Sequence, residues 1–235
     1  MALPLNTTAS NDPTTVARYH MVEQQIRPWN VSDIEVLELL SRIPREDFVP
    51  AAYRAMAFVD MEIPLLPDTD AALRDGHCML APKIEARLLN DLQVQPGERV
   101  LEIGAGSGYM AALLAGRAER VVSLETHPAL AQMARENLAR AGIQNADVRQ
   151  ANGATDPIPD GPFDVIVLSG SVAEVPQRLL DLLADGGRLA AIVGQQPMMR
   201  TTIVRRNGAQ FESSQPWDTV AARLQGFAEP SRFQF

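Results

Sequence analysis

Three glycines at alternate positions, Gly104, Gly106 and Gly108, stand directly after a short apolar run that carries one acid, Glu102. The apolar residues around this acid are typical of a buried strand, and glycine lets the main chain turn sharply or approach a ligand without a Cβ in the way. Ligands of open α/β sheets bind outside the carboxyl ends of the strands. The pattern therefore predicts that a small molecule lies against the main chain between residues 104 and 108.

Two interpretations of this stretch compete. Gly106, Gly108 and Ala111 match the G-x-G-x-x-A pattern of dinucleotide sites, and Glu125 follows at a suitable distance to hold a ribose. The denser Glu-x-Gly-x-Gly-x-Gly pattern that begins at Glu102 instead resembles the S-adenosylmethionine site of Rossmann-like methyltransferases. A nicotinamide-dependent oxidoreductase would also need a proton-handling His, Lys or Tyr in a catalytic domain, and the sequence offers no candidate for one. We therefore favour S-adenosylmethionine.

Strand-like apolar runs alternate with helical patterns through the second half of the chain. The predicted strands are residues 100–103, 121–124, 146–149, 163–168 and 189–193, and the predicted helices are residues 82–92, 110–114, 129–141 and 175–183. Such alternation indicates a parallel sheet that helices cover on both faces. The pair Asn207-Gly208 then predicts a tight hairpin between residues 202–206 and 210–212. The expected fold class is α/β, a Rossmann-like sandwich with a seven-stranded, mostly parallel sheet and an antiparallel strand near the C-terminus.

The first 80 residues are interpreted as a helical extension and not as a second full domain. Residues 1–13 are expected to be a flexible tail, and residues 14–80 to form a cap of helices and loops. Within the cap, a helix is predicted over residues 14–26, a short helix over residues 48–58 and a long loop over residues 68–76. Ser32 and Glu35 predict a capping box for a further helix with Ile34, Leu37 and Leu40 on its apolar side.

The remaining boundaries place the cofactor-binding domain at residues 81–219 and a C-terminal tail at residues 220–235. This tail carries Phe227, Phe233 and Phe235. These aromatic residues either pack back over the sheet or meet a second subunit, and the sequence leaves both possibilities open.

The overall composition excludes several classes of partner. The formal charge of −8 argues against a nucleic-acid backbone or an anionic membrane, and no apolar run approaches the roughly 20 residues that span a bilayer. A single cysteine, Cys78, cannot form an intrachain disulfide, which suits a reducing compartment. The first residues show no secretory signal pattern, so a cytoplasmic location is expected. His20, His77 and His127 are scattered and predict no metal site.

Five segments narrow the resemblance to one family. MVEQQIRP, PREDFVP, VLEIGAGSGYMAALLA, PFDVIVLSGSVAEVP and GGRLAAIVG, within residues 18–206, resemble the protein-L-isoaspartate O-methyltransferase family, including its helical N-terminal extension. The resemblance implies methyl transfer from S-adenosylmethionine to the carboxylate of an isoaspartyl residue in a damaged protein or peptide, with collapse of the ester to a succinimide and partial return to aspartate. It implies protein repair and no metal.

The resemblance also assigns cofactor contacts. Glu102 and the glycine turn would lie against the amino-acid end of the cofactor, Glu125 would accept hydrogen bonds from both ribose hydroxyls, and Asn152 with Gly153 would face the adenine. The full set implied is Met79, Leu80, Glu102, Gly104, Ala105, Gly106, Gly108, Glu125, Thr126, Asn152, Gly153, Ala154 and Ser169. A carboxylate acceptor with a pKa near 4 is already ionised at neutral pH, so placement about 3 Å from the methyl carbon does most of the work.

The chain departs from the family's pattern at three places. The family usually carries Gly-Gln-Thr-Ile-Ser-Gln-Pro, whose serine helps to orient the acceptor, whereas residues 76–82 are GHCMLAP and Leu80 takes the serine position. Asn152 replaces the acid of the usual Gly-Asp-Gly. The usual Thr-Ala-Ala after the fourth strand has become Ser169-Gly170-Ser171.

Two explanations fit these departures. Either the hydroxyl has moved to Ser169 or Ser171, which makes these the candidate catalytic residues, or the pocket is retuned for another carboxylate or a small molecule. The first explanation predicts that Ser171→Ala cuts methyl transfer at least about tenfold. A rival hypothesis from another class is a family member that no longer catalyses and serves as a cofactor-binding module.

Overall fold

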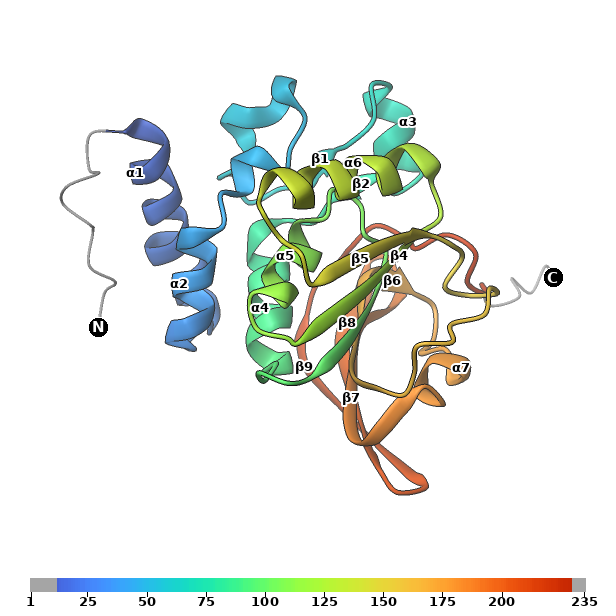
Figure 1. The fold of residues 1–235 in the computed structure, drawn as a ribbon. Coiled ribbons are helices and arrows are strands. Elements are labelled where there is room, and N and C mark those ends of the chain that lie inside the picture. The colour runs from blue at the N-terminus through green and yellow to red at the C-terminus, as the bar shows by residue number, and fades with distance from the viewer. Residues whose placement is uncertain (1–11, 230–235) are drawn as a thin grey trace.

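The computed structural model describes residues 12–229 and contains one seven-stranded sheet in the order β5-β4-β3-β6-β7-β8-β9 (Figure 1). Its strands are β3 (Arg99–Ile103), β4 (Arg120–Glu125), β5 (Ala146–Gln150), β6 (Phe163–Val172), β7 (Leu183–Gln195), β8 (Met198–Asn207) and β9 (Gln210–Asp218). The strands from β5 to β7 in this order pair in parallel, whereas β8 is antiparallel to both of its neighbours. The predicted fold class is confirmed.

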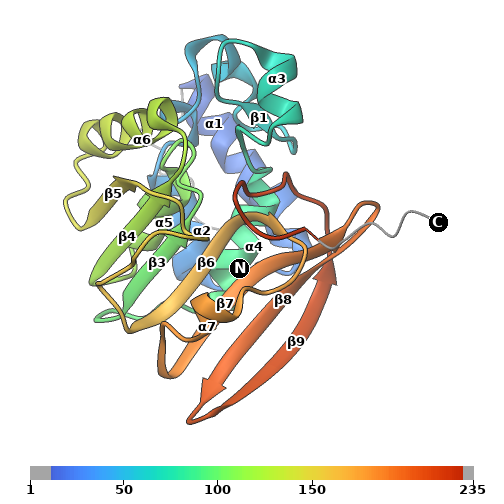
Figure 2. The same cartoon turned by 90° about the vertical axis from the view of Figure 1, so that its right-hand side faces the viewer.

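The two faces of the sheet are covered unequally. Side chains alternate along β3, so Val100 packs toward one hydrophobic cluster and Leu101 toward the other. The first cluster receives the helices α4 (Pro82–Leu92), α5 (Tyr109–Ala115) and α6 (Pro128–Arg140). Within residues 12–229, the opposite face of the sheet is covered by only one α-helix, the short α7 (Gln177–Leu180). The chain that follows β5 runs beside α7 as a loop (Figure 2).

The region around α7 differs from the sequence prediction. A helix was expected over residues 175–183, but α7 ends at Leu180 because Leu183 already pairs with Phe163 as the first residue of β7. A second hairpin, at residues 195–198, joins β7 to β8, and the sequence analysis did not predict it. The predicted hairpin at Asn207-Gly208 is confirmed, with Asn207 opposite Gln210.

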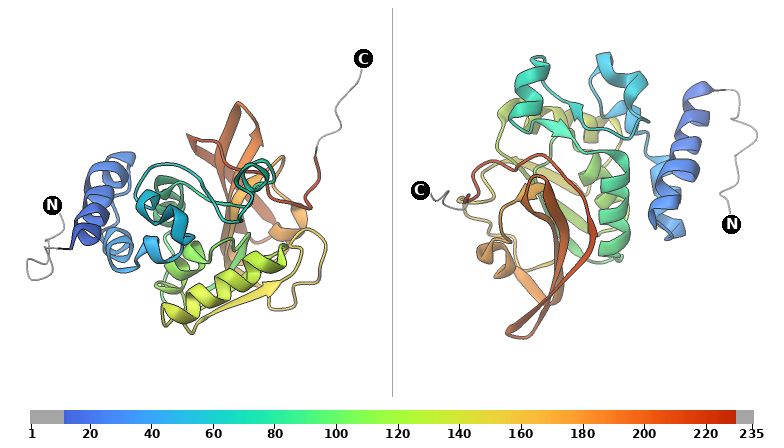
Figure 3. Two further views of the ribbon diagram at one scale, coloured as in Figure 1. Left: turned by 90° about the horizontal axis from the view of Figure 1, so that it is seen from above. Right: turned by 180° about the vertical axis from the view of Figure 1, so that it is seen from behind.

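The N-terminal extension packs as an additional helical layer outside α4, on the side away from the sheet (Figure 3). Its elements are α1 (Pro13–His20), a π-helical stretch (Met21–Ile26), a 3-10 turn (Arg27–Trp29), α2 (Ile34–Arg42) and two further 3-10 turns (Arg45–Asp47, Ala51–Met56). The predicted helix over residues 14–26 is thus largely confirmed, and the one expected over 48–58 is a 3-10 helix. Most of the predicted tail, residues 1–11, lies outside the described residues, which begin at Asp12, the N-cap of α1.

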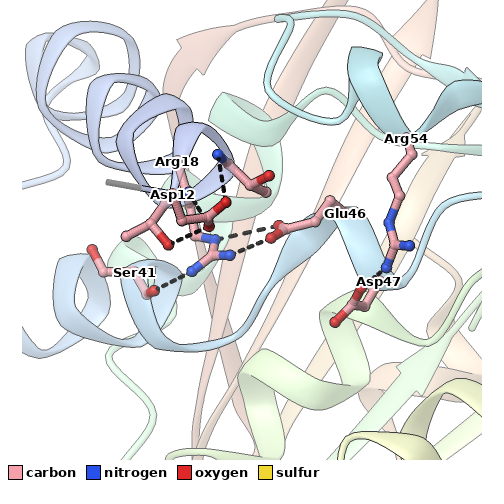
Figure 4. Close-up of polar contacts among 8 residues, drawn as sticks. Asp12, Arg18, Ser41, Glu46, Asp47 and Arg54 are labelled. Atoms are coloured by element: carbon pink, nitrogen blue, oxygen red, sulfur yellow. Dashed lines mark hydrogen bonds and ion pairs between the residues drawn. The ribbon is translucent and has the colours of Figure 1, made fainter. Parts of the chain in front are cut away.

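Arg18 of α1 holds these elements together (Figure 4). Its guanidinium pairs with the carboxylate of Glu46 and donates a hydrogen bond of 3.1 Å to the Ser41 carbonyl oxygen. Beside this pair, Arg54 contacts Asp47 in a more exposed ion pair. One guanidinium therefore links α1 to the end of α2 and to the 3-10 turn that follows it.

The predicted capping box of α2 is wrong. Asp33, and not Ser32, is the N-cap, and its carboxylate accepts a hydrogen bond of 2.9 Å from the Glu35 amide. Both residue types are good N-caps, so the sequence alone did not separate them. Ile34, which was expected on the apolar side, is 55% exposed as the first residue of α2, while Leu37 and Leu40 are buried as expected.

The long loop predicted at residues 68–76 is also wrong. Asp68 caps a short helix, α3 (Thr69–Arg74), by accepting a hydrogen bond of 3.0 Å from the Ala71 amide. On either side, β1 (Ile63–Pro64) and β2 (Cys78–Met79) pair antiparallel. The segment is thus a small ordered unit, which stands above the glycine turn.

A buried arginine joins the extension to the core of the sheet. Arg45 has no exposed surface, pairs with the carboxylate of Glu85 in α4, and donates hydrogen bonds to the carbonyl oxygens of Ala57 at 2.9 Å and Leu80 at 2.6 Å. Its guanidinium carbon lies 5.1 Å from the centre of the Tyr109 ring. Because a buried charge is tolerated only when it is paired and hydrogen-bonded, these contacts fix the extension against α4 and α5.

Candidate functional site

The glycine turn after β3 requires its glycines for steric reasons. Gly104, Gly106 and Gly108 have φ angles of 92°, 51° and 82°, which lie in the left-handed region that L side chains rarely adopt. A Cβ on Gly108 would also lie 3.1 Å from the backbone of Ala134 in α6. The amide of Gly104 donates to the Leu124 carbonyl oxygen at 2.8 Å, which ties the turn to the end of β4.

Glu125, the last residue of β4, is held by the main chain on both carboxylate oxygens. Oε2 accepts a hydrogen bond from the Gly106 amide and Oε1 one from the His127 amide, each at 2.9 Å. The side chain is 6% exposed and lines the cavity that the glycine turn also lines. Each carboxylate oxygen can accept a further hydrogen bond, so the group is oriented in advance to bind a pair of hydroxyls.

Glu102 sits in the middle of β3 with no exposed surface. Its carboxylate accepts hydrogen bonds from the hydroxyls of Ser123 at 2.5 Å and Ser169 at 2.8 Å. Burial raises the pKa of Glu102 to about 7, although these two hydrogen bonds act in the opposite direction. The three residues form one polar chain beneath the glycine turn, and Ser169 is its member at the cavity wall.

The carboxyl ends of β3, β4 and β6 surround a cavity of about 50 Å³, and a second of about 20 Å³ lies beside it. Of the predicted cofactor residues, the first cavity is lined by Gly104, Gly106, Glu125, Thr126, Gly153 and Ser169, and the second by Met79, Leu80, Glu102, Gly104, Ala105, Gly106 and Ser169. Gly108, Asn152, Ala154 and Ser171 lie outside the lining of these two cavities. The structure thus brings most of the predicted residues together.

The loop after β5 is shaped by Asn152. Its main-chain amide donates a hydrogen bond of 2.9 Å to an Asp156 carboxylate oxygen, and its side-chain oxygen accepts one of 2.9 Å from the main-chain amide of Ala154. A Cβ on Gly153 would lie 2.7 Å from the Ile103 side chain, so the loop lies close against the end of β3. The predicted adenine-side residues therefore adjoin the glycine turn.

The two candidate catalytic serines lie in different surroundings. Ser169 is half-buried at the cavity wall and donates to Glu102. Ser171 has no exposed surface, and its hydroxyl donates to the carbonyl oxygen of Ala221 at 2.9 Å. Leu80, which the sequence analysis predicted at the serine position, is buried beside the smaller cavity and offers no hydrogen bond from its side chain.

Some residues at the site were not found from the sequence. Arg223, Leu224 and Gln225 line the larger of these two cavities, although residues 220–235 were predicted to be a tail. Phe227 packs on the hydrophobic cluster of the sheet, so this part of the chain folds back over the sheet, whereas Phe233 and Phe235 lie outside the described residues. In the sequence, the apolar side chains of Leu224 and Phe227 are the signal that residues 223–227 pack on the sheet. The main-chain hydrogen bonds of Ala222 and Leu224 leave no such signal.

Two histidines stand at the rim of the cavity. The rings of His77 and His127 meet edge to face with their centres 4.8 Å apart. Next to His77, burial raises the pKa of the Cys78 thiol, which keeps it protonated. Within residues 12–229, no group of three His, Cys, Asp or Glu side chains is arranged to hold a metal ion.

Comparison with known proteins gives a consistent result. The family model described as protein-L-isoaspartate(D-aspartate) O-methyltransferase matches residues 17–220. A protein-L-isoaspartate O-methyltransferase of Methanoculleus marisnigri is 40% identical over 198 residues, which are 84% of this chain and 86% of the relative. One named protein-L-isoaspartate O-methyltransferase 1, from Rhodopseudomonas palustris, is 42% identical over 187 residues, 79% of this chain and 73% of its own.

Solved structures agree on the fold. A protein-L-isoaspartate O-methyltransferase superimposes with a TM-score of 0.75 at 24% identity, covering 87% of this chain and 65% of that longer chain. A second, from Plasmodium falciparum in complex with S-adenosyl-L-homocysteine, has a TM-score of 0.70 at 21% identity and covers 87% of this chain and 96% of its own.

Proposed function

Because the chain belongs to the protein-L-isoaspartate(D-aspartate) O-methyltransferase family, it is an S-adenosylmethionine-dependent methyltransferase, and we propose that it acts on L-isoaspartyl residues of damaged proteins. The observation that carries this proposal is the family match across residues 17–220, which spans the helical extension, the glycine turn and the acid that ends β4. Relatives of 40% and 42% identity over most of the chain carry the same activity in their names.

The residues at the sheet edge fit the cofactor. Gly104 and Gly106 carry no side chain of their own between the main chain and the place proposed for the amino-acid part, and Glu125 presents an oriented carboxylate to the ribose hydroxyls. Thr126, Asn152, Gly153 and Ala154 are proposed to surround the adenine, and Met79, Leu80, Glu102, Ala105, Gly108 and Ser169 to complete the site. When bound, S-adenosylmethionine supplies a methyl group attached to a sulfonium, which is a good leaving group.

The chain's own part in the reaction is placement. The acceptor carboxylate is ionised at neutral pH, so no residue has to remove a proton from it. What remains is to hold one carboxylate oxygen in line with the methyl group while water is excluded. Ser169 is our first candidate to orient this carboxylate, because its hydroxyl lies at the cavity wall. Its one hydrogen is donated to Glu102 at 2.8 Å, and we propose that the hydroxyl turns to donate it to the acceptor carboxylate instead.

Binding and transfer can be tested separately. Calorimetric titration with S-adenosylhomocysteine is expected to show binding, and Glu125→Gln is expected to weaken it at least about tenfold, since hydrogen bonds to a charged acceptor contribute about 1.5–3 kcal/mol. Glu136→Gln, at an exposed position of α6, is the matched control and should bind as the unaltered protein does.

The substrate is tested with two synthetic peptides of one sequence. A labelled-methyl assay should show transfer to the peptide with an isoaspartyl residue and none to the peptide with ordinary aspartate. Equal labelling of both peptides, or labelling of neither, would contradict the proposed substrate. Transfer to a different carboxylate or to a small molecule would identify a retuned acceptor.

One observation favours a second candidate function. Leu80 has no hydroxyl, and from the resemblance of residues 76–82 to the family's pattern we infer that it replaces a serine that orients the acceptor. A member that binds the cofactor without catalysing would show calorimetric binding and no transfer to any peptide. The same two assays therefore separate an enzyme from a binding module.

We also propose that the protein acts in the cytoplasm. Support comes from the single cysteine, which suits a reducing compartment. Among residues 12–229, no helix has both the length and the apolar character to cross a membrane.

A further inference from the structure

A short segment after the last strand crosses the carboxyl edge of the sheet. We call residues 221–226 the strap, and Figure 2 shows this part of the chain, in dark red, running over the ends of β6 and β7 beneath β1 and α3. The Ser171 amide donates to the Ala222 carbonyl oxygen at 2.7 Å, and the Leu224 amide donates to the Ser171 carbonyl oxygen at 2.9 Å. The strap is therefore paired with the end of β6.

The strap is attached on its other side to the unit formed by β1, α3 and β2. The Glu62 carboxylate accepts a hydrogen bond of 3.1 Å from the Ala222 amide, and the Gln225 side chain donates one of 2.8 Å to the Asp75 carbonyl oxygen. A Cβ on Gly76 would lie 2.8 Å from the Arg223 carbonyl oxygen. The strap thus closes the gap between the sheet edge and this unit.

Leu224 covers the glycine turn. A Cβ added to Gly104 would lie 2.7 Å from Leu224 Cδ2, and one added to Gly170 would lie 2.8 Å from the same atom. At the other end of the strap, a Cβ on Gly226 would lie 2.6 Å from the side-chain nitrogen of Asn152. The strap therefore reaches from the residues proposed for the amino-acid end of the cofactor to those proposed for its adenine.

The volumes of the two cavities beside the strap are consistent with the strap filling part of the cofactor site. The cavity between the glycine turn and Glu125 measures about 50 Å³, whereas sites for small molecules usually measure about 300–1,000 Å³. On the far side of the strap lies a cavity of about 660 Å³, whose wall includes Arg74 and Lys83. Gly76 and Arg223 line both cavities, so the strap is the partition between them.

We propose that the strap is an intramolecular occupant of the cofactor site, and that cofactor binding moves Leu224 off the glycine turn and opens the partition. This inference rests on the proposed function, because it takes the ligand to be S-adenosylmethionine. The strap suits such a movement, since Gln225 and Gly226 are exposed and Ala222, Arg223 and Leu224 only half-buried. Segments with few buried contacts open at low free energy.

Hydrogen exchange of the unaltered protein tests the movement directly. A ligand that binds against a fixed wall protects the amides of that wall, whereas a ligand that displaces the strap breaks the hydrogen bonds that join Ser171 to Ala222 and Leu224. With saturating S-adenosylhomocysteine, the peptide covering residues 220–229 should exchange about threefold faster or more. Unchanged or slower exchange in the bound protein would overturn the proposal.

A substitution provides the second measurement. Leu224→Ala shortens the side chain that covers Gly104 and so raises the fraction of molecules with an open site. Since the apparent Kd is the intrinsic Kd divided by that fraction, S-adenosylhomocysteine should bind at least about fivefold more tightly. Met198→Ala truncates an apolar side chain that is 82% exposed at the hairpin between β7 and β8, and it should leave the Kd unchanged.

The outcomes separate this inference from the proposed function. If the unaltered protein and Leu224→Ala bind S-adenosylhomocysteine equally well and exchange at residues 220–229 does not rise, the strap proposal is wrong and the cofactor assignment stands. If neither protein binds it, both are wrong.

Discussion

Glu102 should make the folded protein less stable as the pH rises from 5 to 8. Burial raises the pKa of its carboxyl from 4.5 to about 7, so the folded chain holds a proton that the unfolded chain releases between these two values. The unfolded state then binds fewer protons than the folded state, and stability falls as pH rises. The difference of about 2.5 in pKa, at 1.36 kcal/mol each, corresponds to about 3 kcal/mol, of which about three quarters is lost between pH 5 and pH 8.

Glu102→Gln isolates this contribution. The amide keeps the size of the side chain and can still bond to the hydroxyls of Ser123 and Ser169, but it carries no charge at any pH. The stability of the variant minus that of the unaltered protein should therefore be larger at pH 8 than at pH 5, by about 2–3 kcal/mol. The measurement is the free energy of unfolding in urea at the two pH values, with the variant and the unaltered protein side by side.

Asp160→Asn serves as the control. Hydrogen bonds from Arg149 hold the pKa of Asp160 below its ordinary value of 3.8, so this carboxylate is charged in the folded and the unfolded chain at both pH values. The control should thus lose the same stability at pH 5 as at pH 8. If Glu102→Gln behaved like this control, the reasoning from burial to a bound proton would be refuted.

Two further substitutions test contacts described above. Arg45→Met leaves the Glu85 carboxylate buried without its partner and should lower the free energy of unfolding by about 3–5 kcal/mol. Adding Glu85→Leu should restore most of that loss. Urea unfolding of both variants measures this, and a loss under about 1 kcal/mol for Arg45→Met alone would contradict it. Ser171→Ala should cut methyl transfer to an isoaspartyl peptide at least about tenfold if its hydroxyl serves the reaction, whereas a full rate with tighter binding of S-adenosylhomocysteine would assign that hydroxyl to the strap alone.

The sheet and the glycine turn were predictable from the sequence because their signals are local. Val100, Leu101 and Ile103 form a short apolar run interrupted by one acid, and the glycines that follow have backbone angles that other residues rarely adopt. Glu125 was found for a related reason, since it ends the next apolar run and the ends of neighbouring parallel strands meet at one edge.

The remaining parts could not be predicted because their signals are not local. Ser32 and Asp33 are equally good N-caps, and the choice between them depends on packing of the whole extension. The strap is fixed in part by main-chain hydrogen bonds that join Ala222 and Leu224 to Ser171, and such bonds leave no pattern in the side chains. The role of the candidate serines depends in turn on the strap, so Ser171 could be proposed for the reaction before its hydroxyl was placed against Ala221.

The direction of the last two strands determines where the chain arrives. One reversal at residues 195–198 sends β8 down the sheet, and a second at Asn207-Gly208 sends β9 back up, so that Asp218 pairs with Arg200 at the level of Val193. An odd number of reversals would deliver the following residues to the opposite rim, far from the turn at Gly104. The two additional strands thus bring residues 221–226 back to the edge of the sheet where we propose that the cofactor binds.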